Sequence, residues 1–301
     1  MKVLTGNAYS FHQRGQRDNQ EDARWPNRDI VKAGQPFFVV CDGVGGSEAG
    51  EVASATVCEA FAKTLGHADL SREFTLTDFG RALDYAYDAL DRKSRTLQQD
   101  DIATTLTIAV FHGGGCTLAH IGDSRIYQIR PGIGIIYRSD DHSLVNEMVH
   151  SGIISPEEAV GHPRSNVITR CMRPVDDDEN RSSATVALIR DVKADDCFVL
   201  CTDGVYSCID DDGLVDLISG SPSLDDAVRA LADRCAGSSD NNTAFLIPVS
   251  ETDASPADSR PPVSDGSTVI SSCSNMVTEV ASEKKAPQEN SFTRFFKNLF
   301  K

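Results

Sequence analysis

The sequence predicts an α+β fold in which antiparallel β-strands form the core and helices cover its outer faces. Short apolar runs rich in β-branched and aromatic residues predict strands at residues 37–41, 105–111, 116–122, 125–130, 197–202 and 243–249. Between residues 105 and 130, only a glycine turn and the two-residue break Asp123-Ser124 separate three of these runs. No crossover helix fits there, so these strands must be antiparallel neighbours. A purely parallel, doubly wound sheet is therefore excluded.

Three amphipathic stretches are expected to be helices, at residues 49–65, 77–98 and 224–236. In the second stretch, apolar residues recur at helical spacing with charged residues on the far side, which predicts a helix lying on a sheet; they are Phe79, Leu83, Ala86, Tyr87 and Leu90. The third has a start typical of a capping box, with Ser223 three residues before Asp226, and Gly237 is a plausible stop.

The composition changes near residue 250 and divides the chain into three parts. Residues 1–250 predict one domain, and residues 251–290, rich in Ser, Pro, Asp and Thr, predict a disordered linker. Residues 291–301, SFTRFFKNLFK, would place aromatic side chains on one helical face bordered by cations. Such a segment could dock on a partner, on an anionic membrane surface or on its own acidic domain. The alternative is a frayed terminus whose Phe residues pack on the domain.

Charge and cysteine usage limit the class of protein. A formal net charge of -16 disfavours nucleic acid as a partner, because no basic face could offset that field. No apolar segment approaches the roughly 20 residues of a membrane span, and the N-terminus lacks the apolar stretch of a signal peptide. Nine cysteines occur without CxxC pairs, which predicts reduced thiols in a cytoplasmic protein, expected to be a monomer. A zinc site at Cys197, Cys201 and Cys208 is disfavoured, since its spacing fits no common zinc finger.

Four aspartates occupy similar positions, each at the end of an apolar run and beside a small or turn-forming residue. They are Asp42, Asp123, Asp203 and Asp240. Any single Asp-Gly is typically a turn. Several carboxylates converging where strands leave the core would repel one another unless cations neutralise them, so the joint pattern indicates a hard-cation site. A further acidic cluster, RDNQED, lies at residues 17–22.

The glycine-rich stretch 37–50, FFVVCDGVGGSEAG, is not a phosphate-binding P-loop. A P-loop ends with a lysine and a Ser/Thr, but here the lysine is absent and Asp42 leads the glycines. That carboxylate would repel a phosphate, whereas a metal between the two makes it a bridge. A haloacid-type phosphotransferase needs a second aspartate two positions later, where Val44 stands.

Together these motifs resemble the metal-dependent Ser/Thr protein phosphatases of type 2C, in their compact bacterial form. The resemblance covers residues 7–249, and seven motifs fall in the family's order: RDNQED at 17–22, DGVGG at 42–46, ATTL at 103–106, GDSR at 122–125, DHS at 141–143, TDGV at 202–205 and DNNT at 240–243. It implies two antiparallel sheets in a central sandwich, flanked by helices on both outer faces.

The resemblance also implies a site with two Mg²⁺ or Mn²⁺ ions. Asp42 would bridge both ions, and the carbonyl of Gly43 would bind one of them. Asp203 and Asp240 would bind the other ion, and Asp123 together with Asp203 would hold a third, weaker one. The chemistry agrees with these ligands, since paired divalent ions can acidify a water that attacks phosphorus in line.

Three further residues take roles from the resemblance. Glu21 and Asp22 would orient metal-bound waters, and Arg17 would bind the substrate phosphate through two hydrogen bonds. The implied function is hydrolysis of phosphoserine and phosphothreonine in protein substrates, opposing a Ser/Thr kinase.

The sequence departs from the family pattern at two places. Many members carry a histidine, interpreted as the general acid, where Val44 stands, so either a metal-bound water protonates the leaving group or catalysis is slower. His142 is expected to belong to a structural turn. Relatives usually have Leu-Gly after the arginine of residues 169–172 (TRCM), so the family pattern does not predict the conformation of this turn. Residues 143–172 lie where bacterial members carry a flap, which would tune substrate choice.

Two alternatives stay open at this point. A catalytically weak or silent family member would act as a phosphoprotein-binding regulator through its tail, although a pseudoenzyme typically loses ligands such as Asp42, Asp203 and Asp240. A different two-metal phosphoesterase would act on a small molecule instead of a protein.

Overall fold

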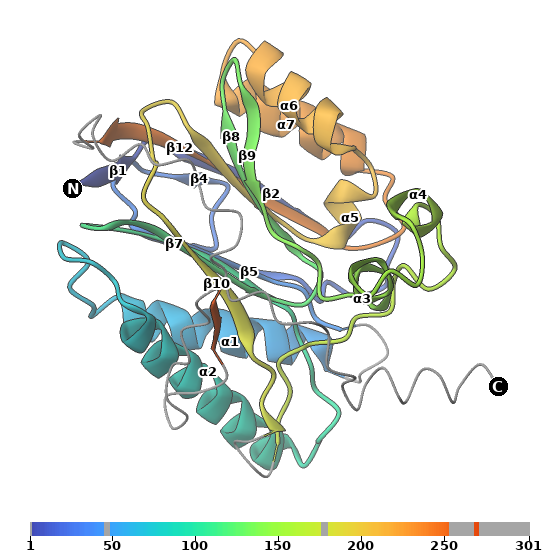
Figure 1. The fold of residues 1–301 in the computed structure, drawn as a ribbon. Coiled ribbons are helices and arrows are strands. Elements are labelled where there is room, and N and C mark those ends of the chain that lie inside the picture. The colour runs from blue at the N-terminus through green and yellow to red at the C-terminus, as the bar shows by residue number, and fades with distance from the viewer. Residues whose placement is uncertain (1, 45–48, 176–179, 253–267, 271–301) are drawn as a thin grey trace.

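The structure is a computed structural model, and it describes residues 2–44, 49–175, 180–252 and 268–270. Two antiparallel sheets pack face to face, with a layer of helices outside each sheet (Figure 1). The expected α+β sandwich is therefore confirmed.

The first sheet has seven strands in the order β4-β2-β12-β11-β8-β9, with β1 also paired to β12. The strands are β1 (Val3–Thr5), β2 (Ala8–Gln13), β4 (Ile30–Val31), β8 (Arg125–Arg130), β9 (Gly134–Arg138), β11 (Cys197–Cys201) and β12 (Asn242–Thr252). The second sheet has six strands in the order β13-β10-β7-β6-β5-β3. They are β3 (Ala23–Trp25), β5 (Phe37–Cys41), β6 (Leu106–His112), β7 (Gly115–Ile121), β10 (Ala184–Ile189) and β13 (Thr268–Ile270).

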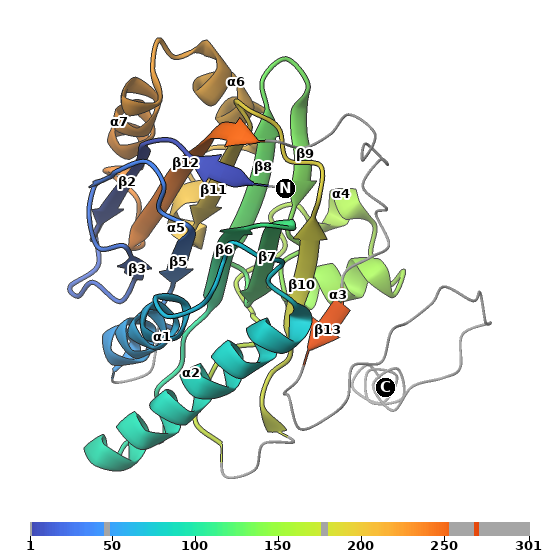
Figure 2. The same ribbon diagram turned by 90° about the vertical axis from the view of Figure 1, so that its left-hand side faces the viewer.

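Helices cover both outer faces. Helices α1 (Gly50–Leu65) and α2 (Leu76–Leu97) lie side by side on the second sheet, and α6 (Asp211–Gly220) and α7 (Leu224–Cys235) lie on the first (Figures 1 and 2). The short helix α5 (Asp203–Tyr206) follows β11, while α3 (Leu144–His150) and α4 (Pro156–Ala159) lie in the segment between β9 and β10. Helix α2 begins with a capping box in which Thr75 and Asp78 each accept a backbone N–H of the other.

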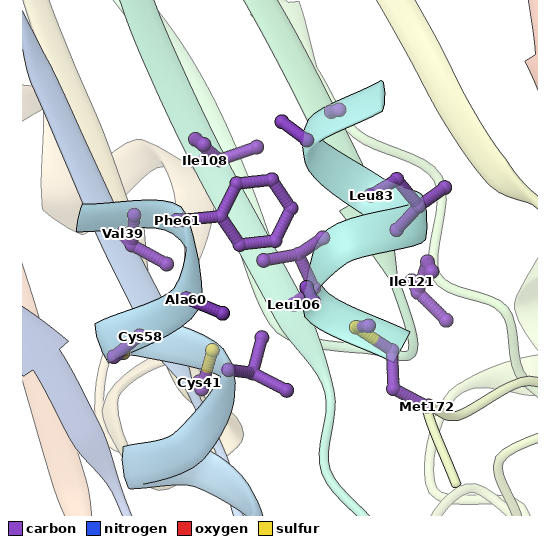
Figure 3. Packing of buried hydrophobic residues seen from close by; sticks show 14 of the residues in the cluster. Val39, Cys41, Cys58, Ala60, Phe61, Leu83, Leu106, Ile108, Ile121 and Met172 are labelled. Atoms are coloured by element: carbon purple, nitrogen blue, oxygen red, sulfur yellow. The ribbon is translucent and has the colours of Figure 1, made fainter. Parts of the chain in front are cut away.

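Each strand of the sandwich alternates between two apolar layers. In β5, Phe38 and Val40 face the other sheet, whereas Val39 and Cys41 face α1 and α2. The layer between the sheets contains edge-to-face ring pairs, with Phe38 and Phe245 centroids 5.2 Å apart. Figure 3 shows the layer under α1 and α2, where Phe61 packs among residues of both helices and the sheet. Because both faces of such a strand are occupied by apolar layers, the side chains available to form a site are those at the strand ends.

All the predicted strands and helices are present, with ends within one residue of those expected except for β12, which ends three residues later. Ser223 caps α7 by accepting the backbone N–H of Asp226 at 3.1 Å and donating its hydroxyl to the Asp226 carboxylate at 2.7 Å. The structure adds β1–β4, β9, β10, β13 and α3–α6, which the sequence patterns did not indicate.

The tail differs from its prediction at one point. Strand β13 lies within residues 251–290, expected to be disordered, and pairs with the edge strand β10, placing Val269 opposite Thr185. The rest of that segment beyond residue 252, and the whole of the docking segment 291–301, lie outside the described residues. Among the residues that are described, no helix combines the length and the apolar character needed to cross a bilayer.

Candidate metal centre

Asp42 follows the last residue of β5, and the neighbouring strand fixes its backbone. Its carbonyl accepts hydrogen bonds from the Thr104 hydroxyl and the Thr105 N–H, both at 2.8 Å. Its own N–H donates to the Thr105 hydroxyl at 2.9 Å. The ATTL motif thus holds the backbone of the predicted bridging ligand and leaves its half-buried carboxylate available.

Gly43 lies in a space that admits no side chain. A Cβ at this position would lie 2.5 Å from the carbonyl carbon of Gly50 and 2.7 Å from the carbonyl oxygen of Glu21. The Gly43 N–H donates to that same Glu21 oxygen at 3.1 Å. The close packing against the first residue of α1 explains why the residue after Asp42 is glycine. Gly45 and Gly46 lie outside the described residues.

Asp22 is buried behind Asp42 and held by two hydroxyl groups. Thr243 donates to its Oδ2 at 2.6 Å and Thr202 donates to the same atom at 3.1 Å. Its other oxygen, Oδ1, is buried with no hydrogen-bond partner among the described residues. Burial raises the pKa of Asp22 to about 7, against the effect of the two hydroxyls, and Asp203 raises it further.

The chain between β11 and β12 makes a helical excursion that contains α6 and α7. Asp203 and Asp240 lie at opposite ends of this α6–α7 excursion and meet at the same site. Asp203 is the first residue of α5, and its buried Oδ1 also lacks a partner among the described residues. Asp240 accepts the N–H of Asn241 at 2.8 Å on Oδ1 and a guanidinium N–H of Arg17 at 2.7 Å on Oδ2. Asp240 is therefore partly neutralised by Arg17.

Asp123 lies in the buried bend between β7 and β8. Gly122, just before it, has a φ of +103°, and a Cβ there would lie 2.6 Å from a methyl carbon of Thr105. The Thr105 hydroxyl bonds the backbone of Asp42, so one threonine positions both loops. Burial raises the pKa of Asp123 to about 7, and the negative charge of Asp203 adds to the shift.

The four aspartates and Asp22 repel one another. Burial raises the pKa of Asp42 well above its usual range, and the charges of Asp22, Asp203, Asp123 and Asp240 raise it further. The pKa of Asp203 is also raised, first by burial and then by Asp240. A cluster that disfavours its own ionisation in this way is stabilised by a divalent cation.

The donor set fits Mg²⁺ or Mn²⁺. Carboxylate and carbonyl oxygens suit these hard cations, and two carboxylate oxygens, Asp22 Oδ1 and Asp203 Oδ1, are buried without a partner among the described residues. In the described part of the chain, no three Asp, Glu, His or Cys side chains converge closely enough to hold an ion by themselves. The bound ions would therefore keep several waters, as Mg²⁺ commonly does in proteins.

Glu21 is half-buried between Gly43 and α1, and its backbone is tightly held. Its carbonyl accepts the Ser54 hydroxyl at 2.6 Å, and its N–H donates to the Asn241 side-chain oxygen at 2.7 Å. Burial raises the pKa of its carboxyl group, and the nearby Arg17 opposes that shift. The structure thus brings all eight predicted site residues, Arg17, Glu21, Asp22, Asp42, Gly43, Asp123, Asp203 and Asp240, to one end of the sandwich.

Three residues that lie inside the motifs TDGV and DNNT, but to which the sequence assigned no role, organise this site. Thr202 and Thr243 hold Asp22, and the amide of Asn241 donates to the carbonyls of Arg14 and Asn19 at 2.8 and 2.9 Å. Asn241 thereby ties the acidic loop to the start of β12. Its place in the DNNT motif is the only signal in the sequence for this residue. That it holds a loop more than 200 positions away can be seen only in the folded structure.

Two motifs that are distant in the sequence meet beside Asp123. Arg125 forms two hydrogen bonds with the Asp141 carboxylate, of 2.8 and 2.7 Å, and its guanidinium carbon lies 3.7 Å from the ring centroid of Tyr206. This paired and stacked arginine joins GDSR, DHS and the end of α5.

His142 has a structural role, as expected. It is buried and stacked on His120 with ring centroids 4.4 Å apart. Its Nδ1 accepts the N–H of Gly122 at 3.1 Å, and its Nε2 lies 2.9 Å from the Thr185 hydroxyl. Burial lowers its pKa to about 2, and His120 and Arg170 add to that shift. The imidazole is therefore neutral and holds the loop before Asp123.

The segment 143–172 is anchored at both ends. Ser143 caps α3 and pairs with Ile168 in an isolated bridge. Met172, in the unusual TRCM turn, is buried and exchanges two backbone hydrogen bonds with Thr104, of 3.0 and 2.8 Å. The turn therefore ends on the residue that holds Asp42, without the Leu-Gly of relatives.

The family comparison agrees with this geometry. Residues 11–244 match the sequence profile described as "Protein phosphatase 2C". The chain belongs to the protein phosphatase 2C family.

Relatives within this protein phosphatase 2C family cover most of the chain. Protein phosphatase PhpP of Streptococcus pneumoniae is 32% identical over 255 residues, which are 79% of this chain and 95% of that protein. Serine/threonine protein phosphatase PstP of Mycobacterium tuberculosis is 30% identical over 236 residues, 77% of this chain and 43% of PstP.

Solved structures show the same fold. The Mycobacterium tuberculosis phosphatase PstP/Ppp superposes with a TM-score of 0.71 at 28% identity, covering 83% of this chain and 100% of that one. Stp1 from Staphylococcus aureus gives 0.71 at 28% identity, with coverages of 83% and 98%. The PstP catalytic domain in complex with two manganese ions gives 0.63 at 26% identity, with coverages of 82% and 100%.

Proposed function

We propose that this member of the protein phosphatase 2C family is an Mg²⁺- or Mn²⁺-dependent protein phosphatase that hydrolyses phosphoserine and phosphothreonine. The observation that carries the proposal is the cluster of mutually repelling carboxylates around Asp42, with buried oxygens of Asp22 and Asp203 that lack partners among the described residues. The relatives named as Ser/Thr phosphatases, one of them crystallised with two manganese ions, support it.

The proposed ligands follow the sequence prediction. Asp42 would bridge two ions, with the Gly43 carbonyl on one and Asp203 and Asp240 on the other. Asp123 lies close enough to Asp203 to raise its own pKa through that charge, which supports a third, weaker ion between them. The ions, when bound, would acidify a water and neutralise the phosphate.

The protein's own groups would orient the substrate and the waters. Arg17 is exposed and its side chain points to Asp240 at 2.7 Å, so it can reach a phosphate bound beside that ligand. Asp22 and Glu21 would accept hydrogen bonds from waters of the site. Val44 offers no proton donor in its side chain, so a water of the site would protonate the leaving serine or threonine oxygen.

The physiological substrates would be phosphoproteins made by a cytoplasmic Ser/Thr kinase, and the protein would act in signalling. The segment 143–172 would select among these substrates, since it ends at Thr104 beside Asp42. Docking by residues 291–301 remains part of the proposal. Deleting residues 285–301 should change localisation or activity toward whole protein substrates, and a deletion that changes neither would exclude docking.

The decisive experiment compares substrates and metals with the full chain. We expect hydrolysis of a phosphothreonine peptide with Mn²⁺ or Mg²⁺, none with EDTA, and a lower kcat/KM for p-nitrophenyl phosphate than for the peptide. A preference for small phosphate esters would favour the small-molecule phosphoesterase. Tight phosphopeptide binding without turnover would favour the silent regulator.

A further inference from the structure

Two cysteines form the neck of the helical excursion between β11 and β12. Cys208 lies five positions after Asp203, in the turn that follows α5, and Cys235 lies five positions before Asp240, at the end of α7. Helix α6 and most of α7 lie between them in the chain. The two ends of this excursion therefore lead directly to the two aspartates of the candidate metal centre.

The side chains at this neck are in contact. Cys208 packs against the apolar layer that contains Cys235. Burial and then the neighbouring Cys208 thiol raise the pKa of the Cys235 thiol, so the two thiols lie close together. The Cys208 thiol also lies 3.4 Å from the carbonyl oxygen of Gly204, and its own carbonyl accepts the Arg234 Nε–H at 2.9 Å. These contacts place the two cysteines beside each other in the folded chain, as a disulfide requires.

The two cysteines of the neck differ in burial. Cys208 is half-buried, whereas Cys235 is fully buried in the apolar layer under α6 and α7. A partly accessible thiol beside a buried one is the arrangement in which an oxidant reaches the first sulfur and the second resolves the product.

A second thiol pair in the same domain provides the comparison. Cys41 and Cys58 lie in one apolar cluster, and burial and then Cys58 raise the pKa of the Cys41 thiol; Figure 3 shows both residues within the layer beneath α1. Their exposed fractions are 0% and 3%, so an oxidant in solution reaches neither sulfur. The two pairs are alike in the closeness of their thiols and differ in the access of solvent to them.

We propose that Cys208 and Cys235 are a modification site, a dithiol that a peroxide converts to a disulfide across the neck of the α6–α7 excursion. The Cys208 sulfur attacks the peroxide, an S–O bond forms, the O–O bond breaks, and an alcohol or water leaves. The Cys235 sulfur then attacks the sulfenic acid, the S–S bond forms and water leaves. Two thiols lose two electrons and two protons, and the peroxide is reduced.

The bond would close a covalent loop from residue 208 to residue 235. Loop closure restricts the unfolded chain, so the oxidised protein should unfold at a higher temperature than the reduced protein. It would also remove the thiol donor from the carbonyl of Gly204, which keeps the hydroxyls of Ser207 and Ser238, both at 3.2 Å. The disulfide would thus link the two ends of the excursion, while the Gly204 carbonyl beside Asp203 keeps two hydrogen-bond donors.

The test uses the full chain with Cys171→Ser and Cys273→Ser, so that both thiol pairs remain and the only other cysteines are the buried Cys116, Cys197 and Cys201. Metal-free protein is treated with hydrogen peroxide, unfolded in an alkylating reagent and mapped by peptide mass spectrometry. We expect a linked Cys208–Cys235 peptide, formed at least roughly tenfold faster than any Cys41–Cys58 peptide. Cys235→Ser should instead leave Cys208 as a sulfenic acid that a 1,3-dione probe labels.

Equal rates for the two pairs, or alkylated Cys208 and Cys235 after treatment, would overturn the proposal. The proposal would also be overturned if the linked peptide formed but the unfolding temperature did not rise. The expected rise is one that dithiothreitol reverses, and its absence would mean that the bond strains the neck. The peptide map does not depend on phosphatase activity, so its result is separate from that of the proposed function.

Discussion

The hydroxyl of Thr243 donates a 2.6 Å hydrogen bond to the carboxylate of Asp22, which lies 221 positions earlier in the chain. The two residues join the loop before β3 to the start of β12, and so connect the two sheets at the candidate metal centre. Outer residues of this kind set the orientation of what a metal holds.

Thr243→Val is therefore expected to lower Mn²⁺ affinity by about tenfold, because Asp22 loses its shorter hydrogen bond. Isothermal titration with Mn²⁺ measures the change. Thr107→Val is the matched control, since Thr107 is equally buried and donates to the Val40 carbonyl at 2.9 Å. Equal losses in both variants would show that Thr243 acts only through general stability.

Asp42→Asn should have opposite effects on function and on stability without metal. Phosphopeptide hydrolysis should fall by at least about 100-fold, because a ligand is lost. In EDTA, however, the variant should unfold at a higher temperature, since the substitution removes a carboxylate that four others repel. Asp216→Asn, on an exposed position of α6, should change neither quantity. A destabilised Asp42→Asn in EDTA would contradict the repulsion argument.

Arg17→Ala should raise KM for a phosphopeptide by about 10-fold to 100-fold, the cost of a lost charge-assisted hydrogen bond. Mn²⁺ affinity should not fall, because Asp240 is released from its 2.7 Å contact with the guanidinium. Arg14→Ala is the control, as Arg14 is also exposed but donates to the Asp18 carbonyl at 3.3 Å. Steady-state kinetics at saturating Mn²⁺ separate the two variants.

The buried imidazole of His142 should contribute a loss of stability as the pH falls from 7 to 5, opposite in sign to the contribution of Asp22 and Asp123, whose pKa values are raised to about 7 in the folded chain. The pKa of His142 is about 2 in the folded chain, below its ordinary value of 6.5, so the unfolded chain binds a proton that the folded chain does not. Each such imidazole contributes a loss of about 1.4 kcal/mol per pH unit below its ordinary pKa. His12 and His112, with pKa values lowered to about 4, act in the same direction.

His142→Gln should remove the contribution of His142 to the slope of unfolding free energy against pH. His67→Gln, at an exposed position, should leave that slope unchanged. Urea unfolding at several pH values gives the slopes. The comparison uses slopes because His142→Gln also loses packing against His120, which lowers stability at every pH. Parallel pH profiles for His142→Gln and the unsubstituted protein would show that this imidazole is already protonated when folded.

Arg130→Ala should destabilise the fold by about 3 kcal/mol, because it leaves a buried charge unpaired. Its partner Asp196 is 0% exposed and receives two N–H groups of Arg130, at 2.7 and 2.9 Å. Arg138→Ala should cost less than about 1 kcal/mol, since its ion pair with Asp211 is exposed; the two side chains are 43% and 32% exposed. Chemical unfolding of both variants in EDTA tests the contrast.

Local sequence patterns predicted the interior of this fold well. The runs at β5, β6 and β11 are almost entirely apolar or β-branched, which is typical of strands buried on both faces. Strands such as β4, with two residues, and β3, with three, are too short for an alternation to be visible. They exist because a neighbouring strand supplies the hydrogen bonds, and that is a property of the assembled sheet.

Asp42, Asp123 and Asp203 were predictable because each follows a strand, whereas Asp240 lies after α7 and just before β12. The groups that hold these carboxylates were not predictable. Thr202 and Thr243 look like ordinary strand residues in the sequence, since threonine is common in sheets. Their roles depend on β11 and β12 being paired, which places Thr202 opposite Thr243 with an N–H to carbonyl distance of 3.1 Å. Only that pairing aims both hydroxyls at Asp22.

The pairing of β13 with β10 has a consequence for protein handling. Without β13, β10 would be the edge of its sheet, and the backbone groups of Ala184–Ile189 would face solvent as a template for another strand. A chain cut after residue 252 should therefore self-associate more readily than the full chain at high concentration. The stretch Thr268–Ile270, within a segment whose composition suggested a mere spacer, acts in this fold as a guard against aggregation.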